Sequence, residues 1–351
     1  MRRLPTRLSA SCRVNGMRHR IAVCVLIAVA VTTISASQDS ASSPQPTFDA
    51  FLADVRQDAL DAGITPATLD LAFAGLTPEP VVVSRDRNQP EIVQSLDTYL
   101  RQRLTTRTRT TARQMHARHA QLLAGVASQY GVPAGVLTAV WGLESNFGRF
   151  TGTYPTVRAL ATLAWDNRRA LFRTELLAAL RMIDQGVPLE LMKGSWAGAM
   201  GQPQFMPSSF LRHAVDFDRD GATDIWTSLP DVFGSMGHYL KNAGWVEGER
   251  WGREVAVSSS VLAAVDRAVP MRTEGCRAIR LMTEARPLAE WSRLGVRLVG
   301  GDALPRADME ASLVRGERRS FLVYRNYFAL LDYNCSHSYA LAVGLLADGI
   351  K

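Results

Sequence analysis

Helical periodicity runs through most of this 351-residue chain and limits the folds open to it. Between residues 48 and 74, apolar side chains recur three and four positions apart, which places them on one face of a helix. The same spacing returns in several later stretches and near the chain end. We therefore predict a mainly α protein, with further helices over residues 89–104, 121–130, 133–144, 154–165, 168–184 and 338–350.

Two segments depart from this pattern. Residues 194–209 (GSWAGAMGQPQFMPSS) hold three glycines and two prolines, which predicts a tight loop whose backbone comes close to another group. Residues 255–330 shift toward Val, Ser and short alternating runs such as VRLVG and FLVYRNYFAL, which predicts β-structure. The expected fold therefore has a helical core, an N-terminal helical region and a smaller β-containing segment.

The first 37 residues have the pattern of an export signal. A basic stretch ends at Arg20, residues 21–34 (IAVCVLIAVAVTTI) are apolar, and Ser35-Ala36-Ser37 supplies small side chains for cleavage. The apolar run is short for a membrane span. We expect a periplasmic protein that is soluble after cleavage; the alternative is an uncleaved anchor that holds the protein at the membrane.

The formal charge of +7 does not indicate a nucleic-acid partner. Six arginines and no acids lie in residues 1–37, so the rest of the chain has 34 basic and 33 acidic side chains. This balance predicts no binding of DNA or RNA. Residues 99–143 nevertheless contain no acid, and their cationic face is either a solvated helix surface or a site for an anionic polymer. Its arginines are Arg101, Arg103, Arg107, Arg109, Arg113 and Arg118.

Export also changes how the cysteines are interpreted. Cys12 and Cys24 would leave with the signal, and Cys276 and Cys335 would remain in a compartment where disulfides persist. A disulfide and two separate buried thiols are both open, because the sequence does not fix the distance between the two residues. The scarcity of neighbouring ligands argues against a structural zinc site.

A single acid closes an apolar helix. Residues 136–143 (VLTAVWGL) carry no charge, and Glu144 follows them. A carboxyl at this position loses water, which raises its pKa toward the range of a general acid. The alternative is an ordinary helix-end glutamate paired with Arg149. Five tryptophans of the central region suit either a sugar-binding surface or a core: Trp141, Trp165, Trp196, Trp226 and Trp245.

Residues 216–227 (DFDRDGATDIWT) follow the spacing of an EF-hand loop. Oxygen ligands fall at loop positions 1, 3, 5, 7 and 9, and Gly221 occupies position 6. Thr227 replaces the bidentate glutamate of position 12, which weakens the predicted affinity, and Asp231 is a candidate ligand beyond the loop. We expect a structural Ca²⁺, with a solvated Asx turn as the alternative. The predicted ligands are Asp216, Asp218, Asp220, the Ala222 carbonyl and Asp224.

Five blocks, in order along the chain, resemble the membrane-bound lytic murein transglycosylase B family. They are VWGLESNFGRFTG, GSWAGAMGQPQFMPSSF, VDFDRDGATDIW, GSMGHYLKNAGW and DYNCSHSYALAVGLLADGI. The resemblance implies a lysozyme-like core that cleaves peptidoglycan between N-acetylmuramic acid and N-acetylglucosamine and leaves 1,6-anhydromuramoyl ends. The expected regions are a signal peptide (1–37), a polar tether (38–47), an N-terminal helical region (48–110), the catalytic core with the EF-hand-like loop (111–245), a β-containing segment (246–330) and a C-terminal segment that returns to the core (331–351).

The resemblance also implies roles for individual residues. Glu144 would protonate the glycosidic oxygen and then, as a carboxylate, accept the proton of the muramoyl 6-hydroxyl. This reaction needs neither a second carboxylate nor a cofactor. Glycan strands are the expected partner, and we expect a monomer that associates at most peripherally with the membrane. A hydrolytic muramidase and a non-catalytic cell-wall binding protein are the alternatives. The implied substrate-binding residues are Ser195, Gln204, Tyr239, Tyr333, Asn334 and Tyr339.

Overall fold

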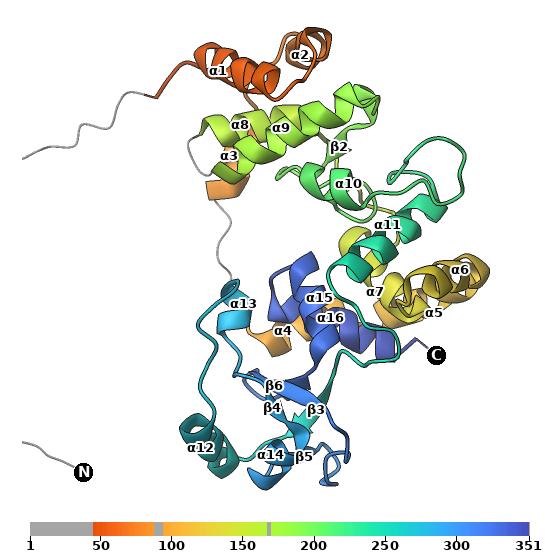
Figure 1. Ribbon diagram of the computed structural model, residues 1–351, viewed down its shortest axis with the longest axis vertical. Helices are drawn as coiled ribbons and strands as arrows, with labels where there is room; N and C mark the ends of the chain where they lie inside the picture. The colour runs from red at the N-terminus through yellow and green to blue at the C-terminus, as the bar shows by residue number, and fades with distance from the viewer. Residues whose placement is uncertain (1–44, 88–93, 167–169, 351) are drawn as a thin grey trace, which may run out of the picture. The chain divides into compact units, whose positions relative to one another are not determined.

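Helices make up most of the chain in the computed structural model, which confirms the fold class predicted from periodicity (Figure 1). The structure describes residues 45–87, 94–166 and 170–350. The export signal and the first part of the polar tether therefore lie outside the described residues. Among the described helices, none is by itself long and apolar enough to cross a membrane; α6 and α7 meet that test only jointly, across a bend of 111°.

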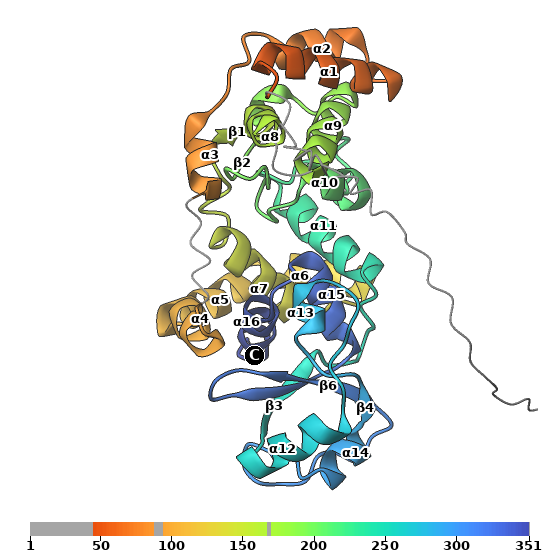
Figure 2. The same cartoon turned by 90° about the vertical axis from the view of Figure 1, so that its left-hand side faces the viewer.

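The first hydrophobic core surrounds α7 (Ala134–Ser145). Its residues from Val136 to Gly142 are all buried, because α5, α6, α11 and α16 pack against different sides of the helix. Figure 2 shows α7 beside α16 and α5. The other helices of this core are α4 (Leu96–Arg103), α5 (Thr106–Arg118), α6 (Ala120–Tyr130), α11 (Leu229–Asn242), α15 (Arg325–Tyr333) and α16 (His337–Asp348).

A second core lies between the N-terminal helices and the pair α8 and α9. Thr47 and Thr65 cap α1 and α2 by accepting backbone N–H groups, and Arg173 of α9 forms ion pairs with two aspartates of α1. A short ribbon of β1 (Tyr154–Pro155) and β2 (Lys193–Gly194) leads into the glycine-rich loop. The helices of this part are α1 (Phe48–Asp61), α2 (Pro66–Phe73), α3 (Pro80–Arg87), α8 (Thr156–Trp165), α9 (Ala170–Asp184), η1 (Leu189–Leu191) and α10 (Pro207–His213).

The third core belongs to a five-stranded antiparallel sheet with the order β4-β6-β7-β3-β5. Trp291 and Phe321 are fully buried, the first beneath the sheet and the second where the sheet meets the helical core. The strands are β3 (Gly252–Ala256), β4 (Arg286–Pro287), β5 (Arg297–Leu298), β6 (Glu310–Arg315) and β7 (Ser320–Val323), and the helices between them are α12 (Ser259–Ala268), α13 (Arg277–Arg280) and α14 (Leu288–Arg293).

Several boundaries differ from those expected. The helical pattern over residues 48–74 belongs to two helices, α1 and α2, which residues 62–65 separate. The prediction of β-structure over residues 255–330 was wrong for α12, α13, α14 and the start of α15. In FLVYRNYFAL the strand ends at Val323 and a helix begins at Arg325, since the buried side chains beyond that point recur at helical spacing. The loop predicted for residues 194–209 ends at Met206, because Pro207 begins α10 as its first residue.

A disulfide joins Cys276 and Cys335, which resolves the alternative that the sequence left open. Their Cα atoms are 6.3 Å apart, within the ordinary range. Cys276 is the N-cap of α13 and Cys335 lies between α15 and α16, so the bridge fixes the segment that precedes α13 against the end of α15.

Replacing both cysteines by serine should lower the free energy of unfolding by about 4 kcal/mol. The bridge closes a loop with a sequence separation of 59 residues, and its removal restores chain entropy to the unfolded state. Urea unfolding of the variant and the wild type measures the difference. Equal midpoints with equal slopes would contradict the expectation.

Candidate active site

Glu144 lies in the last turn of α7, immediately before a sharp reversal of the chain. Asn146 ends the helix in a left-handed conformation (φ 50°), and Phe147 (φ 60°) and Gly148 (φ 79°) continue in the same region. Ser145 closes the turn, because its Oγ accepts the Gly148 N–H at 3.0 Å. Two consecutive non-glycine residues in this conformation indicate strain that the surrounding packing supports.

The carboxyl of Glu144 is an unusually weak acid. It lines a pocket of about 350 Å³, and burial raises its pKa from 4.5 to about 7. The Tyr339 hydroxyl and the Arg103 guanidinium partly oppose this shift. Among the described residues, no other carboxylate lines the pocket and no ion pair joins Glu144 to Arg149. The group is therefore suited to give up a proton near neutral pH and then to accept one.

Three tyrosines form a row that begins beside this carboxyl. The rings of Tyr339 and Tyr333 are nearly parallel with centroids 6.4 Å apart, and Tyr239 follows at 4.7 Å from Tyr333. Burial raises the pKa of all three phenols, and the charge of Glu144 adds to the shift at Tyr333 and Tyr339. The hydroxyls stay protonated and can act as hydrogen-bond donors. The structure thus brings Tyr339 and Tyr333 close to Glu144 and packs Tyr239 against Tyr333.

Hydrogen bonds fix this row to the rest of the site. The Tyr333 hydroxyl donates to the Pro203 carbonyl at 2.6 Å, which ties the end of α15 to the glycine-rich loop. The Tyr239 hydroxyl donates to the Asp332 carbonyl at 3.0 Å. Asn334 follows Tyr333 directly, and its side chain is exposed. These bonds give the tyrosine rings defined positions before any ligand binds.

Backbone contacts position the glycine-rich loop, which we define as residues 194–206. Gln204 has a left-handed conformation (φ 53°), and its Nε2 donates to the carbonyls of Gly201 at 2.8 Å and Thr151 at 3.2 Å. The second bond joins the loop to the segment that follows Glu144. Ser195 lies at another turn of the loop, where its Oγ accepts the Ala199 N–H at 3.1 Å. Both side chains presently serve the fold of the loop, so their contact with substrate remains a prediction.

Sequence reasoning named Arg103 only as part of a cationic face and did not place α4 beside Glu144. Arg103 lines the Glu144 pocket, and its guanidinium lies over the ring of Tyr99 at 5.5 Å from the centroid. Tyr99 is close enough for the charge of Glu144 to raise its pKa, although burial is the larger cause. The two residues are four positions apart on one helix, a spacing that could have marked a shared face.

The central tryptophans serve mainly the core. Trp141 and Trp245 are each 3% exposed, and the Trp141 Nε1 donates to the Gln202 side chain at 2.7 Å. The Gln202 amide in turn donates to the Trp226 carbonyl at 2.9 Å. Gln202 is buried, and it links α7, the glycine-rich loop and the acidic loop, which we define as residues 216–231, the EF-hand-like loop together with the first turn of α11. The sequence did not suggest this role.

The acidic loop gathers three carboxylates. Oxygens of Asp216, Asp218 and Asp231 all lie within 4.8 Å of one another, so this triad could hold a metal ion. Asp231 is fully buried and accepts the N–H groups of Phe217 at 2.7 Å and Asp224 at 2.8 Å. Burial raises its pKa, which a bound cation would reverse.

The other predicted ligands of the loop make different contacts. Asp220 accepts the Ala222 N–H at 2.9 Å, and Asp224 accepts the N–H groups of Trp226 at 2.7 Å and Thr227 at 2.9 Å. Gly221 takes the positive φ of 93° that the sharp turn at position 6 requires. Asp231 adds a carboxylate from the first turn of α11, and ligation by Asp220, Ala222 and Asp224 stays a prediction.

The fold and this site belong to a known protein family. Residues 47–348 match the family described as the transglycosylase SLT domain, and the chain belongs to this family. The match confirms the family predicted from the five sequence blocks. Membrane-bound lytic murein transglycosylase B of Escherichia coli (strain K12) is 34% identical over 229 residues, which cover 63% of this chain and 58% of that relative. The alignment thus spans less than two thirds of the relative's own length.

Solved structures support the same conclusion for the fold. SltB3 from Pseudomonas aeruginosa, in complex with NAG-anhNAM-pentapeptide, is 41% identical and aligns with a TM-score of 0.77 over 86% of this chain and 79% of its own. The lytic transglycosylase Slt35 of Escherichia coli, in complex with calcium, is 26% identical, with a TM-score of 0.69 over 88% of this chain and 93% of its own.

Proposed function

We propose that the chain is a lytic transglycosylase that cleaves the glycosidic bond between N-acetylmuramic acid and N-acetylglucosamine in peptidoglycan. The observation that carries the proposal is the isolation of Glu144. Its carboxyl has a raised pKa of about 7, and no second carboxylate lines its pocket within the described chain. Hydrolysis of glycosides by the usual routes requires two carboxylates at a defined separation. An intramolecular attack by the sugar requires only one.

The mechanism uses Glu144 twice. The protonated carboxyl donates its proton to the glycosidic oxygen as the bond to the anomeric carbon breaks. The resulting carboxylate then removes the proton of the muramoyl 6-hydroxyl, whose oxygen attacks the same carbon and closes the 1,6-anhydro ring. Tyr339 borders this carboxyl with a protonated hydroxyl that could donate a hydrogen bond to the sugar. The Tyr333 hydroxyl, whose proton goes to the Pro203 carbonyl, could accept one. Ser195, Gln204, Tyr239 and Asn334 would line the remainder of the saccharide site.

Product analysis tests this proposal. Mass spectrometry of digested sacculi should find muropeptides that are lighter than the hydrolysed products by one water. Hydrated products alone would establish a muramidase. Undigested sacculi that still retain the protein would establish a cell-wall binding protein. Family membership and the predicted export signal support action in the periplasm on glycan strands.

The rate of cleavage should fall as the pH rises through about 7. The first step requires protonated Glu144, and burial holds its pKa at about 7 rather than 4.5, so the protonated fraction is nearly complete below pH 6 and is lost above pH 8. Initial rates of glycan cleavage from pH 5 to 9 at constant ionic strength measure the profile. A descending limb near pH 5 would show that the carboxyl is not desolvated.

We further propose that the acidic loop binds a structural Ca²⁺ through Asp216, Asp218 and Asp231. Three carboxylates with one buried member suit a hard divalent cation, and the related Slt35 structure is a complex with calcium. The ion would stiffen the connection between α10 and α11 and supply no chemistry to the reaction.

Adding Ca²⁺ in large excess should raise the thermal midpoint by about 5 °C, since a ligand that binds only the folded state stabilises it. Replacing the exposed Asp218 by asparagine should remove most of this shift, whereas Asp302→Asn, an exposed acid outside the loop, should retain it. Differential scanning calorimetry with Ca²⁺, Mg²⁺ and chelator checks the result. A thermal midpoint that does not change when Ca²⁺ is added would contradict the proposed calcium site.

A further inference from the structure

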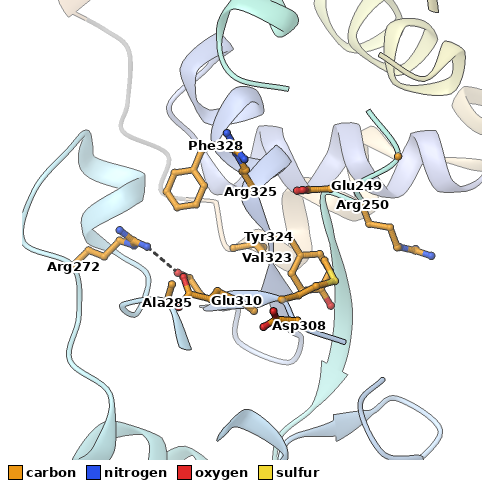
Figure 3. A pocket seen from close by; sticks show the side chains of 14 residues that line it. Glu249, Arg250, Arg272, Ala285, Asp308, Glu310, Val323, Tyr324, Arg325 and Phe328 are labelled. Carbon is orange, nitrogen blue, oxygen red and sulfur yellow. Dashed lines mark hydrogen bonds between the residues drawn. The ribbon is translucent and has the colours of Figure 1, made fainter. Parts of the chain in front are cut away.

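A second pocket, of about 560 Å³, lies between the sheet and the start of α15 (Figure 3). It shares no lining residue with the pocket of Glu144. Its apolar lining includes Met309, which precedes β6, and Ala311 of β6. Val323 of β7 and Phe328 of α15 complete this lining. The proposed reaction at Glu144 gives this cavity no role.

Charged side chains of opposite sign surround the pocket. Figure 3 shows Arg325 and Phe328 of α15 on one side and Asp308 and Glu310 on the opposite side. Arg325, Asp308 and Glu310 are exposed, and within the described chain their side chains form no ion pair or hydrogen bond. A ligand that fits this arrangement carries an anionic and a cationic group with an apolar part between them.

One arginine of the pocket is held in place before any ligand arrives. The guanidinium of Arg272 lies over the Phe328 ring at 5.1 Å from its centroid, and Nη2 donates to the Ser312 hydroxyl at 3.4 Å. Its ion pair with Glu284 is long, at 3.9 Å. A guanidinium oriented in this way retains donors for a carboxylate.

The α15 helix sets the distance between this pocket and the catalytic carboxyl. The helix begins at Arg325, which lines the pocket, and ends eight residues later at Tyr333, which lies beside Glu144. At 1.5 Å per residue, this separation is about 12 Å. An extended peptide of five residues spans roughly 17 Å. A pentapeptide attached to a muramoyl group near Glu144 could therefore reach the pocket.

We propose that this pocket binds the peptide that the glycan strand carries, an inference that rests on the proposed function. The terminal carboxylate would contact Arg272 and Arg325, and an amine of the peptide would contact Asp308 and Glu310. The disaccharide without its peptide keeps only the lactyl carboxylate, which lies on the sugar, so it would leave Arg325, Asp308 and Glu310 without partners. The disulfide at Cys276 also links the segment that carries Arg272 to Cys335 beside Asn334, so the pocket is covalently tied to the site.

Calorimetric titration with NAG-NAM-pentapeptide and with the peptide-free disaccharide NAG-NAM tests the inference directly. Arg325→Gln should weaken binding of the peptide ligand by about 10-fold and leave binding of the disaccharide unchanged. Arg325→Lys should restore part of the affinity. Arg293→Gln, which removes an exposed arginine of α14 outside the pocket, is the matched control and should change neither.

Kinetics separates this inference from the proposed function. Arg325→Gln should raise KM about 10-fold on peptide-bearing sacculi, with kcat unchanged, and should have no effect on glycan strands whose peptides have been removed. Equal affinities and equal KM values for Arg325→Gln and wild type on every ligand would overturn the peptide site. If wild-type protein made no anhydro product, the proposed function would fail, and the titration would still decide whether the pocket binds the peptide.

Discussion

Glu144→Gln should reduce the rate of glycan cleavage by about 10³-fold or more. The glutamine amide cannot donate a proton to the glycosidic oxygen or accept one from the 6-hydroxyl, so both steps lose their proton carrier. Because no other carboxylate lines the pocket in the described chain, no neighbouring acid can substitute for it. Release of soluble muropeptides from purified sacculi measures the loss.

The stability of the same variant separates chemistry from folding. Since the folded-state pKa of Glu144 lies above its ordinary value of 4.5, wild-type stability decreases between about pH 4.5 and 7 as the unfolded chain ionises first. The neutral glutamine avoids this cost. The variant should therefore unfold at an equal or higher temperature than wild type at pH 8. If the variant were inactive and also less stable than wild type, misfolding would explain the loss of activity, and this account would be contradicted.

Gly152→Ala should lower the free energy of unfolding by at least about 4 kcal/mol and disrupt the glycine-rich loop. Gly152 has a positive φ of 92°, and an added Cβ would lie 1.9 Å from the Gly194 carbonyl carbon. The atoms that this Cβ would meet belong to the backbone of Gly194 and Ser195, next to the pairing of β1 with β2. No side-chain rotation can therefore relieve the clash. Urea unfolding measures the change in stability. Activity should fall as well, because Ser195 directly follows Gly194 in the displaced segment.

Gly186 provides a matched control for this substitution. Its φ of 98° is similar, but an added Cβ would have no neighbour within 4 Å. Gly186→Ala should therefore cost only the conformational strain, about 1 kcal/mol. If the two substitutions were equally destabilising, the close approach of Gly152 to Gly194 would not be what positions the loop.

The helical architecture could be predicted because its signals are local. The apolar run that ends in Glu144, the Gly and Pro that separate α6 from α7, and the spacing in α8 are all features of a single segment. The weak acidity expected for Glu144 followed from the same run. Short apolar segments were harder to assign to a helix or a strand. Residues 321–330 alternate like a strand, yet most of them form a helix that is buried against the helical core.

The rest of the site depends on distances that a sequence does not contain. Tyr99 and Arg103 reach Glu144 from a helix about 40 residues earlier, and only the packing of α4 against α16 brings them there. Tyr333 and Tyr339 come from the end of the chain and could be placed only through a family resemblance. The pairing of Cys276 with Cys335 was undecidable for the same reason.

Cleavage of sacculi in water enriched in ¹⁸O tests most directly whether one carboxyl serves as both acid and base. If the muramoyl 6-hydroxyl attacks the anomeric carbon, the new reducing-end fragments should be anhydro species that contain no ¹⁸O. If water attacks instead, each new reducing end should carry one ¹⁸O, and the single-carboxyl mechanism assigned to Glu144 would be contradicted.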